Sequence, residues 1–193
     1  GLMMGEGYVQ TSKQNSGTSY FTNNDDDLLE EVKNFAFSLG LEPKLRQSHP
    51  EKTAKEVYFC GLEQATFLNQ MLGGTSSSKR WPSILFQCPE EEVAAAISGL
   101  FDAEGSVSLD SRKLSIASAS RELMEDTQYL LLRMGIQSRV KEFMNKQYGR
   151  KYFRLMIGGS EVTTFWNKIP IREKDKKERL LKLTQLEVDY NTN

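Results

Sequence analysis

The sequence GLMMGEGYV at residues 1–9 returns in a closely similar form, GLFDAEGSV, at residues 99–107. Shorter matches follow both stretches at nearly constant spacing, which indicates a duplicated unit. These matches pair residues 39–41 with 134–136 and residues 67–69 with 165–167. Because a solenoid needs at least three units, two copies predict a domain with pseudo-twofold symmetry instead.

The residues that follow each stretch predict the same order of elements in both copies. An extended segment (8–22 and 106–118) precedes a helix with apolar residues at helical spacing, which ends at Gly40 or Gly135. Two further strands and a short helix complete each copy: strands at 44–48, 56–60, 138–144 and 152–157, and helices around Phe67 and Phe165. The prediction is an α+β fold in which the order αββαββα occurs twice.

The Gly/Ser-rich segment at 73–78 is the clearest linker between the two copies. We therefore assign residues 1–78 to the first repeat and residues 79–193 to the second. The second repeat also contains a charged run near its C-terminus, at 172–182. This run is interpreted as a solvated helix with charge pairs one turn apart, or alternatively as an arm that contacts nucleic acid.

Charge is unevenly divided between the two repeats. The whole chain of 193 residues has a formal net charge of −1, which by itself does not indicate a nucleic-acid-binding protein. The first repeat, however, holds 6 Lys/Arg and 10 Asp/Glu, whereas the second holds 19 and 16. A basic binding face can therefore coexist with an acidic remainder.

The numbers of cysteines and histidines and the lengths of the apolar runs exclude several classes of protein. Cys60, Cys88 and His49 cannot form a zinc site of the usual Cys/His type. Both cysteines are expected to be buried or free thiols in a reducing cytoplasm. No apolar run approaches the roughly 18 residues of a membrane span. We expect an intracellular protein that does not associate with membranes.

The repeated stretch has the pattern of a helix with one small-residue face. Gly1 and Gly5, like Gly99 and Ala103, lie four residues apart and so share a helix face. Small residues allow two helix backbones to approach closely. We expect the two helices to pack on these faces and to form the pseudo-twofold axis.

Glu6 and Glu104 end these stretches, so the packed helices would hold the two acids side by side. Neighbouring carboxylates repel each other unless their pKa values rise or a cation lies between them. Mg²⁺ prefers one or two carboxylates together with waters and substrate phosphates, which is the arrangement of metal-assisted phosphodiester hydrolysis. A single acid at a helix end is usually a surface residue beside a C-cap, but its repetition in a duplicated unit favours the metal site.

The stretch at 99–107 closely resembles the LAGLIDADG motif of homing endonucleases, and the stretch at 1–9 resembles a more divergent copy. The segments KRWP at 79–82 and VAAAIS at 93–98 resemble the lysine-x-x-proline block that precedes the second motif in intein-type and archaeal intron-type members. The resemblance implies a monomer of two αββαββα halves, whose two antiparallel sheets form a saddle for duplex DNA. Such a protein cuts both strands at a long specific target site.

The resemblance also implies roles for individual residues of the motifs. Glu6 and Glu104 would bind Mg²⁺, with Mn²⁺ as a possible substitute. The main-chain carbonyls of Gly5 and Ala103, which precede the acids, would assist.

Two lysines are candidates for the active-site lysines of the family. Lys79 lies in the block before the second motif, and Lys168 is the nearest counterpart in the second copy, one residue out of register. The alternative for each is an ordinary surface lysine.

Strand alternation predicts which side chains face the duplex. Arg, Lys and Gln residues there would contact phosphates and read bases, although each is equally consistent with an ordinary solvated strand residue. The predicted DNA contacts are Lys13, Gln14, Lys44, Arg46, Arg112, Lys113, Arg139, Lys141, Tyr152 and Arg154.

Three functions compete at this point. The first is a site-specific double-strand DNA endonuclease, favoured by the retained pair of acids. The second is a non-catalytic DNA- or RNA-binding derivative of the fold, such as a maturase or a transcriptional regulator, favoured by the low net charge. The third is a protein-interaction module in which the helix pair is only structural, and the basic strand faces argue against it.

Overall fold

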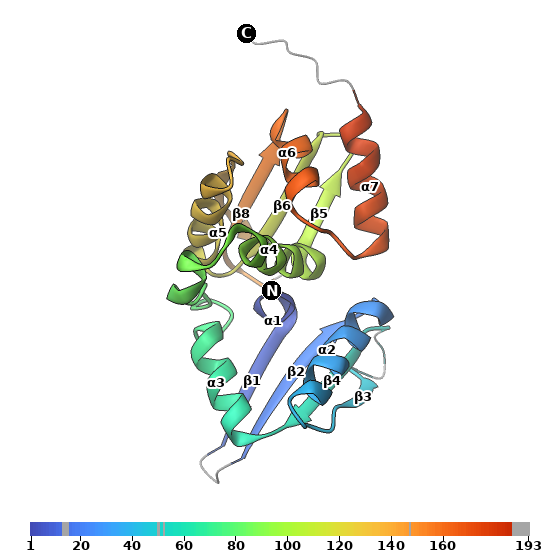
Figure 1. Ribbon diagram of the computed structural model, residues 1–193, viewed down its shortest axis with the longest axis vertical. Coiled ribbons are helices and arrows are strands. Elements are labelled where there is room, and N and C mark those ends of the chain that lie inside the picture. The colour runs from blue at the N-terminus through green and yellow to red at the C-terminus, as the bar shows by residue number, and fades with distance from the viewer. Residues whose placement is uncertain (13–15, 50, 52, 147, 187–193) are drawn as a thin grey trace.

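A computed structural model of the chain describes residues 1–12, 16–49, 51, 53–146 and 148–186. It shows two copies of the predicted order αββαββα, one after the other (Figure 1). The first copy consists of α1 (Leu2–Glu6), β1 (Gly7–Thr11), β2 (Gly17–Asn23), α2 (Asp26–Ser38), β3 (Lys44–Gln47), β4 (Lys55–Cys60) and α3 (Leu62–Leu72). The second consists of α4 (Glu90–Glu104), β5 (Gly105–Ser108), β6 (Lys113–Ser118), α5 (Arg121–Arg133), β7 (Arg139–Asn145), β8 (Arg150–Gly158) and α6 (Glu161–Lys168).

Two elements lie outside the repeat. A short 3-10 helix, η1 (Ser83–Gln87), joins the copies, and α7 (Lys174–Gln185) follows the second copy. The charged run predicted as a solvated helix is therefore helical, but α7 buries Leu180 and Leu183 against the second copy. No helix within the described ranges is long and apolar enough to cross a membrane.

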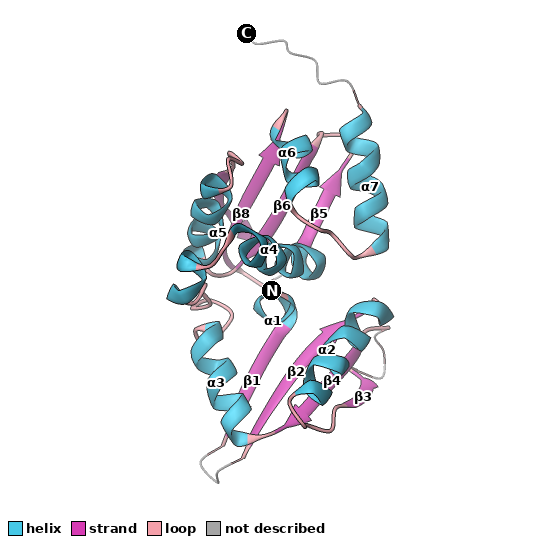
Figure 2. Ribbon diagram, in the orientation of Figure 1, coloured by secondary structure: helices cyan, strands magenta, loops and turns pink. Residues whose placement is uncertain are grey.

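Each copy contains one antiparallel four-stranded sheet, in the order β1-β2-β4-β3 or β5-β6-β8-β7. The register is equivalent in both, since Gly7 pairs with Phe21 where Gly105 pairs with Ile116. Phe21 and Ile116 are among the buried strand residues that face the helices, and the alternate residues form an open face. Helices cover one side of each sheet (Figure 2).

The helix boundaries follow from capping residues that the sequence shows. Asp25 accepts hydrogen bonds from the backbone N–H groups of Asp27 (2.8 Å) and Leu28 (3.0 Å), and so caps α2. Ser120 caps α5 in the same way. Gly40 and Gly135 follow the two helices with φ values of 72° and 76°, the left-handed conformation that glycine adopts without strain.

The two motif helices, α1 and α4, pack directly against each other at the centre of the molecule (Figure 1). The contact leaves no room for larger side chains. A Cβ atom added to Gly5 would lie 2.5 Å from the Ala103 Cβ, and one added to Gly99 would lie 2.7 Å from the Leu2 backbone nitrogen. A single hydrophobic core continues from one copy into the other around this contact.

Replacing Gly99 tests this contact. Gly99→Val would force α1 and α4 apart, and we expect a loss of about 1–3 kcal/mol in the free energy of unfolding, as for other overpacked cores. The matched control is Ala95→Val, at an exposed position one turn earlier in the same helix, which should cost less than about 1 kcal/mol through helix propensity alone. Equal losses in denaturant titrations of the two variants would contradict the proposed close contact.

Candidate metal centre and nucleic-acid interface

Glu6 and Glu104 are the last residues of α1 and α4, where the packed helices end together. A Cβ atom added to Gly5 would lie only 3.0 Å from the Glu104 Cγ, so the second acid lies against the first motif. Asn23, the last residue of β2, donates a hydrogen bond to the Glu6 carboxylate. The structure thus brings together the two acids that the sequence pairs.

The electrostatics of this pair match two carboxylates confined at one place. Burial and the neighbouring Glu104 carboxylate raise the pKa of Glu6 to about 7, against smaller opposing effects of the Asn23 hydrogen bond, Lys176 and Lys79. Burial also raises the pKa of Glu104, opposed by the same two lysines. A divalent cation between the carboxylates would favour their charged forms and relieve this cost.

Lys79 is buried, with 6% of its surface exposed, although it is a charged residue. Its Nζ donates hydrogen bonds to the carbonyl oxygens of Met3 (3.3 Å), Met4 (2.9 Å), Gly5 (2.9 Å) and Gly7 (2.8 Å). The ammonium therefore caps the C-terminal end of α1, where the helix dipole favours positive charge. Burial lowers the pKa of Lys79 to about 8, and both acids oppose this effect.

Lys176, in α7, takes the equivalent place in the second copy. Its Nζ donates to the carbonyl oxygens of Phe101 (3.2 Å), Asp102 and Ala103 (3.4 Å) at the end of α4. Burial lowers the pKa of Lys176 as well. Each motif helix therefore ends in one acid and one capping lysine.

The structure replaces Lys168 with Lys176 as the counterpart of Lys79. Lys168 ends α6 and pairs with Glu90 (2.8 Å) at the opposite end of α4 from Glu104. The repeat could not reveal Lys176, because α7 has no equivalent in the first copy. The signal for Lys176 in the sequence is the basic run at 172–182. The pattern of this run does not show which part of the protein it contacts.

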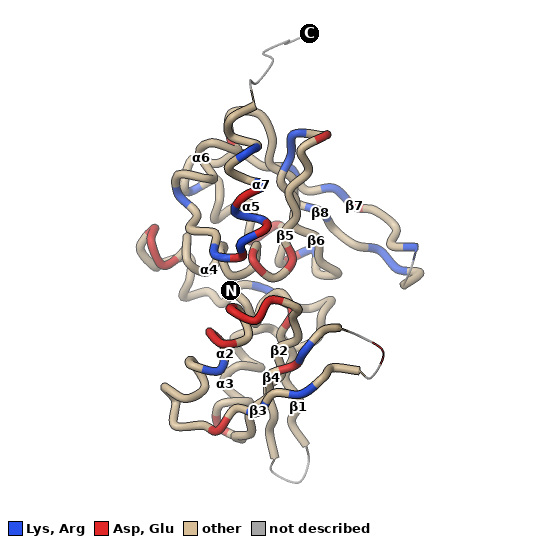
Figure 3. The backbone as a smooth tube through the Cα atoms, turned by 90° about the vertical axis from the view of Figure 1, so that its right-hand side faces the viewer, with Lys and Arg blue, Asp and Glu red and all other residues tan. Residues whose placement is uncertain are grey.

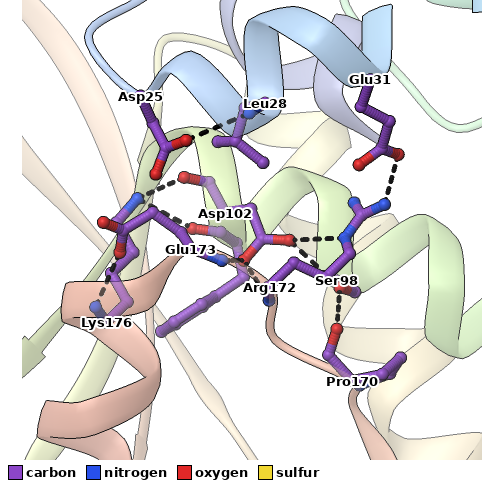
Figure 4. Close-up of polar contacts among 10 residues, drawn as sticks. Asp25, Leu28, Glu31, Ser98, Asp102, Pro170, Arg172, Glu173 and Lys176 are labelled. Carbon is purple, nitrogen blue, oxygen red and sulfur yellow. Dashed lines mark hydrogen bonds and ion pairs between the residues drawn. The ribbon is translucent and has the colours of Figure 1, made fainter. Parts of the chain in front are cut away.

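A buried carboxylate holds α7 in this position (Figure 4). Asp102 accepts hydrogen bonds from the backbone N–H groups of Arg172 and Glu173 (both 3.1 Å), from the Arg172 Nε (3.1 Å) and from the Ser98 hydroxyl (3.3 Å). Arg172 also pairs with Glu31 of α2, which belongs to the first copy. The start of α7, one turn before Lys176, is thereby tied to α4 and to the other half. Neither the repeat nor the helical periodicity of the sequence indicates this cluster.

The open faces of both sheets lie on one side of the molecule (Figure 3). Register confirms the predicted faces: Lys44 and Arg46 share the open face of the first sheet, since they pair with Tyr58 and Glu56. In the second sheet, the open face includes Lys113, Arg139, Lys141, Tyr152 and Arg154.

The structure describes one of the three remaining predicted contacts. Arg112 lies in the turn before β6 and has a φ of 52°. Lys13 and Gln14 fall outside the residues that the structure describes.

A family model described as a LAGLIDADG-like domain matches residues 1–73 and 91–170, which is more than half of the chain. The chain belongs to the LAGLIDADG-like domain family. The two matched segments correspond to the two structural copies, each beginning at or before its motif.

In the curated relatives, the segment that is similar to this LAGLIDADG-like chain is a small part of the whole protein. It is 31% identical over 193 residues to a probable translation initiation factor IF-2 of Methanocaldococcus jannaschii, covering 96% of this chain and 16% of the relative. It is 25% identical over 196 residues to the replication factor C small subunit of the same organism, covering 100% of this chain and 10% of the relative. The chain therefore spans well under a fifth of either protein.

Solved structures share the LAGLIDADG fold at low sequence identity. I-DmoI in complex with DNA and Mn has a TM-score of 0.65 and 19% identity, covering 87% of this chain and 91% of that chain. The N-terminal LAGLIDADG domain of DUF199/WhiA has a TM-score of 0.58 and 13% identity, covering 93% and 82%. These likenesses establish the fold, with its two antiparallel sheets and tandem copies.

A cavity of about 460 Å³ opens beside Glu6 and Glu104, the acids of the two LAGLIDADG-like motifs. Glu6, Glu104 and Lys79 line it together with Tyr152 and Arg154 of the second open face. The acids are therefore reachable from the open face of the second sheet. Among the described residues, no group of three or more His, Cys, Asp or Glu side chains is placed to hold a metal ion.

The Asp102 cluster leads to a stability prediction. Asp102→Ala leaves the part-buried N–H groups of Arg172 and Glu173 without this acceptor, and we expect the free energy of unfolding to fall by about 2–4 kcal/mol. The control, Glu31→Ala, removes only the exposed partner of the same Arg172 and should cost less than about 1 kcal/mol. Urea unfolding of both variants measures the difference, and a small loss for Asp102→Ala would show that α7 is held by other contacts.

Proposed function

We propose that the chain is a site-specific endonuclease that cuts both strands of a long duplex DNA target as a monomer, inside the cell. The observation that carries this proposal is the pair of neighbouring carboxylates, Glu6 and Glu104, at the shared end of two packed helices. Two carboxylates confined at one place disfavour each other's charged form, which costs free energy. A bound cation that also contacts a phosphate would offset this cost and give the pair a function.

The residues present fit Mg²⁺, or Mn²⁺ in its place. Mg²⁺ is commonly held by one or two carboxylates, with waters and substrate phosphates completing its shell. Glu6 and Glu104 would hold it, together with the carbonyl oxygens of Gly5 and Ala103, which also accept bonds from the lysines. When bound, the metal would supply Lewis acidity and a more acidic water at the phosphodiester.

The chain itself would position and stabilise the reacting phosphates. Lys79 and Lys176 place one positive charge beside each acid, where charge on the reacting phosphate would develop. Preorganised charges of this kind contribute strongly because they need no rearrangement during the reaction. The open sheet faces would hold the duplex in register through phosphate and base contacts.

The structural neighbours support this proposal through the conditions under which they were solved. I-DmoI, named a homing endonuclease, is described in complex with DNA and Mn. A further structure of a variant contains its target DNA in the presence of Mg. Binding of DNA and metal is thus described for I-DmoI. For this chain, the proposal of the same binding rests on the carboxylate pair.

A second candidate is a DNA-binding protein of the same fold that does not cut. The observation that favours it is the saturation of both lysines by main-chain carbonyls, which gives them a structural role without catalysis. Cleavage assays separate the two candidates, because both predict duplex binding but only the first predicts metal-dependent cutting.

The decisive experiment incubates the protein with Mg²⁺ and a plasmid library of candidate target sites. We expect cleavage by the wild type and a loss of about 100-fold or more in Glu104→Gln and in Glu6→Gln, because each substitution removes one metal ligand. Glu91→Gln, at the exposed start of α4, removes the same charge and should retain full activity. Binding without cleavage in Mg²⁺ or Mn²⁺ would leave the non-cutting candidate. Unimpaired cleavage by Glu104→Gln would refute the proposed site.

The two capping lysines provide an independent prediction. Lys176→Met should slow cleavage by on the order of 100-fold, as does the loss of one preorganised donor elsewhere, while duplex affinity changes little. Lys168→Met, the matched control in α6, should retain nearly wild-type cleavage rates. Melting temperatures of both variants must be compared first, since Lys176 also caps α4. Equal cleavage rates for the two folded variants would exclude a catalytic contribution from Lys176.

A further inference from the structure

The open faces of the two sheets differ sharply in charge. The open face of the second sheet has five cationic side chains and no carboxylate: Lys113, Arg139, Lys141, Arg150 and Arg154. Within the described part of the chain, none of these five is paired with an acid. Figure 3 shows the corresponding blue segments along β7 and β8.

Among the described residues, the open face of the first sheet has two cations, Lys44 and Arg46, and an acid beside Arg46. The acid is Glu56, which is 5% exposed although it points away from the helices. It pairs with Arg46 through the Nε (2.8 Å) and the NH2 nitrogen (2.6 Å). Tyr8 and Thr22 donate to its second oxygen, at 3.4 Å and 3.3 Å.

Two aromatic rings also contact the Arg46 guanidinium beside Glu56. The guanidinium lies over the rings of Tyr58 (4.9 Å to the centroid) and Tyr20 (5.7 Å). Tyr20 in turn stacks on Tyr8, with ring centroids 4.4 Å apart and planes 5° from parallel. A cation that is paired with a buried carboxylate attracts a phosphate less, because the two charges offset each other. The ring contacts do not distinguish the sheets, since Arg150 lies over Tyr152 (5.4 Å) and Arg154 over Phe143 (4.4 Å) in the second.

We propose that the second sheet captures the duplex through phosphate charge, whereas the first sheet is nearly neutral because Glu56 pairs with Arg46 and so competes with phosphates for it. This inference rests on the proposed binding of duplex DNA, and it divides that binding between the two halves. The first sheet then contacts the duplex through tyrosine, threonine and amide groups, which release few counterions. The DNA half-site over the second sheet is bound first, since charge steers association.

The salt dependence of binding measures this division, because each phosphate neutralised by a cation adds about 0.9 to the slope of log K against log salt. Arg139→Gln/Lys141→Gln, which removes two cations of the second sheet, should lower the slope by about 1.8 and weaken binding at least about 50-fold at 0.1 M salt. Lys44→Gln/Arg46→Gln, which removes two cations of the first sheet, should lower it by less than about 1, because Arg46 is already paired with Glu56.

Glu56→Gln is the sharpest variant, because it keeps the shape of the side chain and releases Arg46. We expect tighter binding of a target duplex and a slope that is larger by about 0.9. Adding Arg46→Gln to this variant should return the slope to the wild-type value. The matched control is Glu30→Gln in α2, which likewise frees a cation, Lys33, from its acid (2.6 Å), but on the helical side of the sheet. Its slope should not change.

The probe is a short duplex carrying the cleaved site, or a mixed-sequence duplex if none has been found, with folding checked by circular dichroism. A folded Glu56→Gln protein with an unchanged slope would overturn the inference, as would equal slope losses from the two sheets. The comparison of the sheets holds even if Glu56→Gln does not fold. Failure of the wild type to bind any duplex at low salt would instead overturn the proposed function.

Discussion

The structure depends on the contact between the small-residue faces of α1 and α4. Gly5 lies against Ala103, and Gly99 lies against the backbone of α1, so neither position has room for a further carbon atom. Such an approach fixes where both helices end, and therefore where Glu6 and Glu104 lie. It also sets the two sheets beside each other, because β1 and β5 follow the motif helices without an intervening residue.

Two lysines from different parts of the chain complete this arrangement. Lys79 lies between the copies in sequence, yet its ammonium caps α1 while its carbonyl accepts a hydrogen bond from Ser120 of the second copy (2.5 Å). Lys176 is carried by α7, which Asp102 ties to α4. The acids thus lie beside cations whose positions depend on packing between the halves. Structural capping and a catalytic role are compatible here, because the charges that stabilise the helix ends also face the acids.

The two halves have kept the same topology but differ in surface chemistry. Their registers are equivalent at Phe21 and Ile116, and their helices are capped at equivalent positions. Only the first open face contains a buried acid, Glu56, with an arginine bound to it. A duplicated fold can therefore carry one nearly neutral and one cationic face, and the net charge of −1 conceals this difference.

The sequence by itself determined the tandem order αββαββα, the helix caps, the strand faces and the pairing of Glu6 with Glu104. These features depend on local periodicity and on an internal repeat, and both are visible in one dimension. Only the tertiary structure decided that Lys176 rather than Lys168 matches Lys79, that Asp102 anchors α7, and that Glu56 holds Arg46. The contacts of Lys176 and Asp102 join elements that share no periodicity, and the contact of Glu56 with Arg46 depends on the register between β3 and β4. The partner of a charged group therefore becomes known only when the chain is packed.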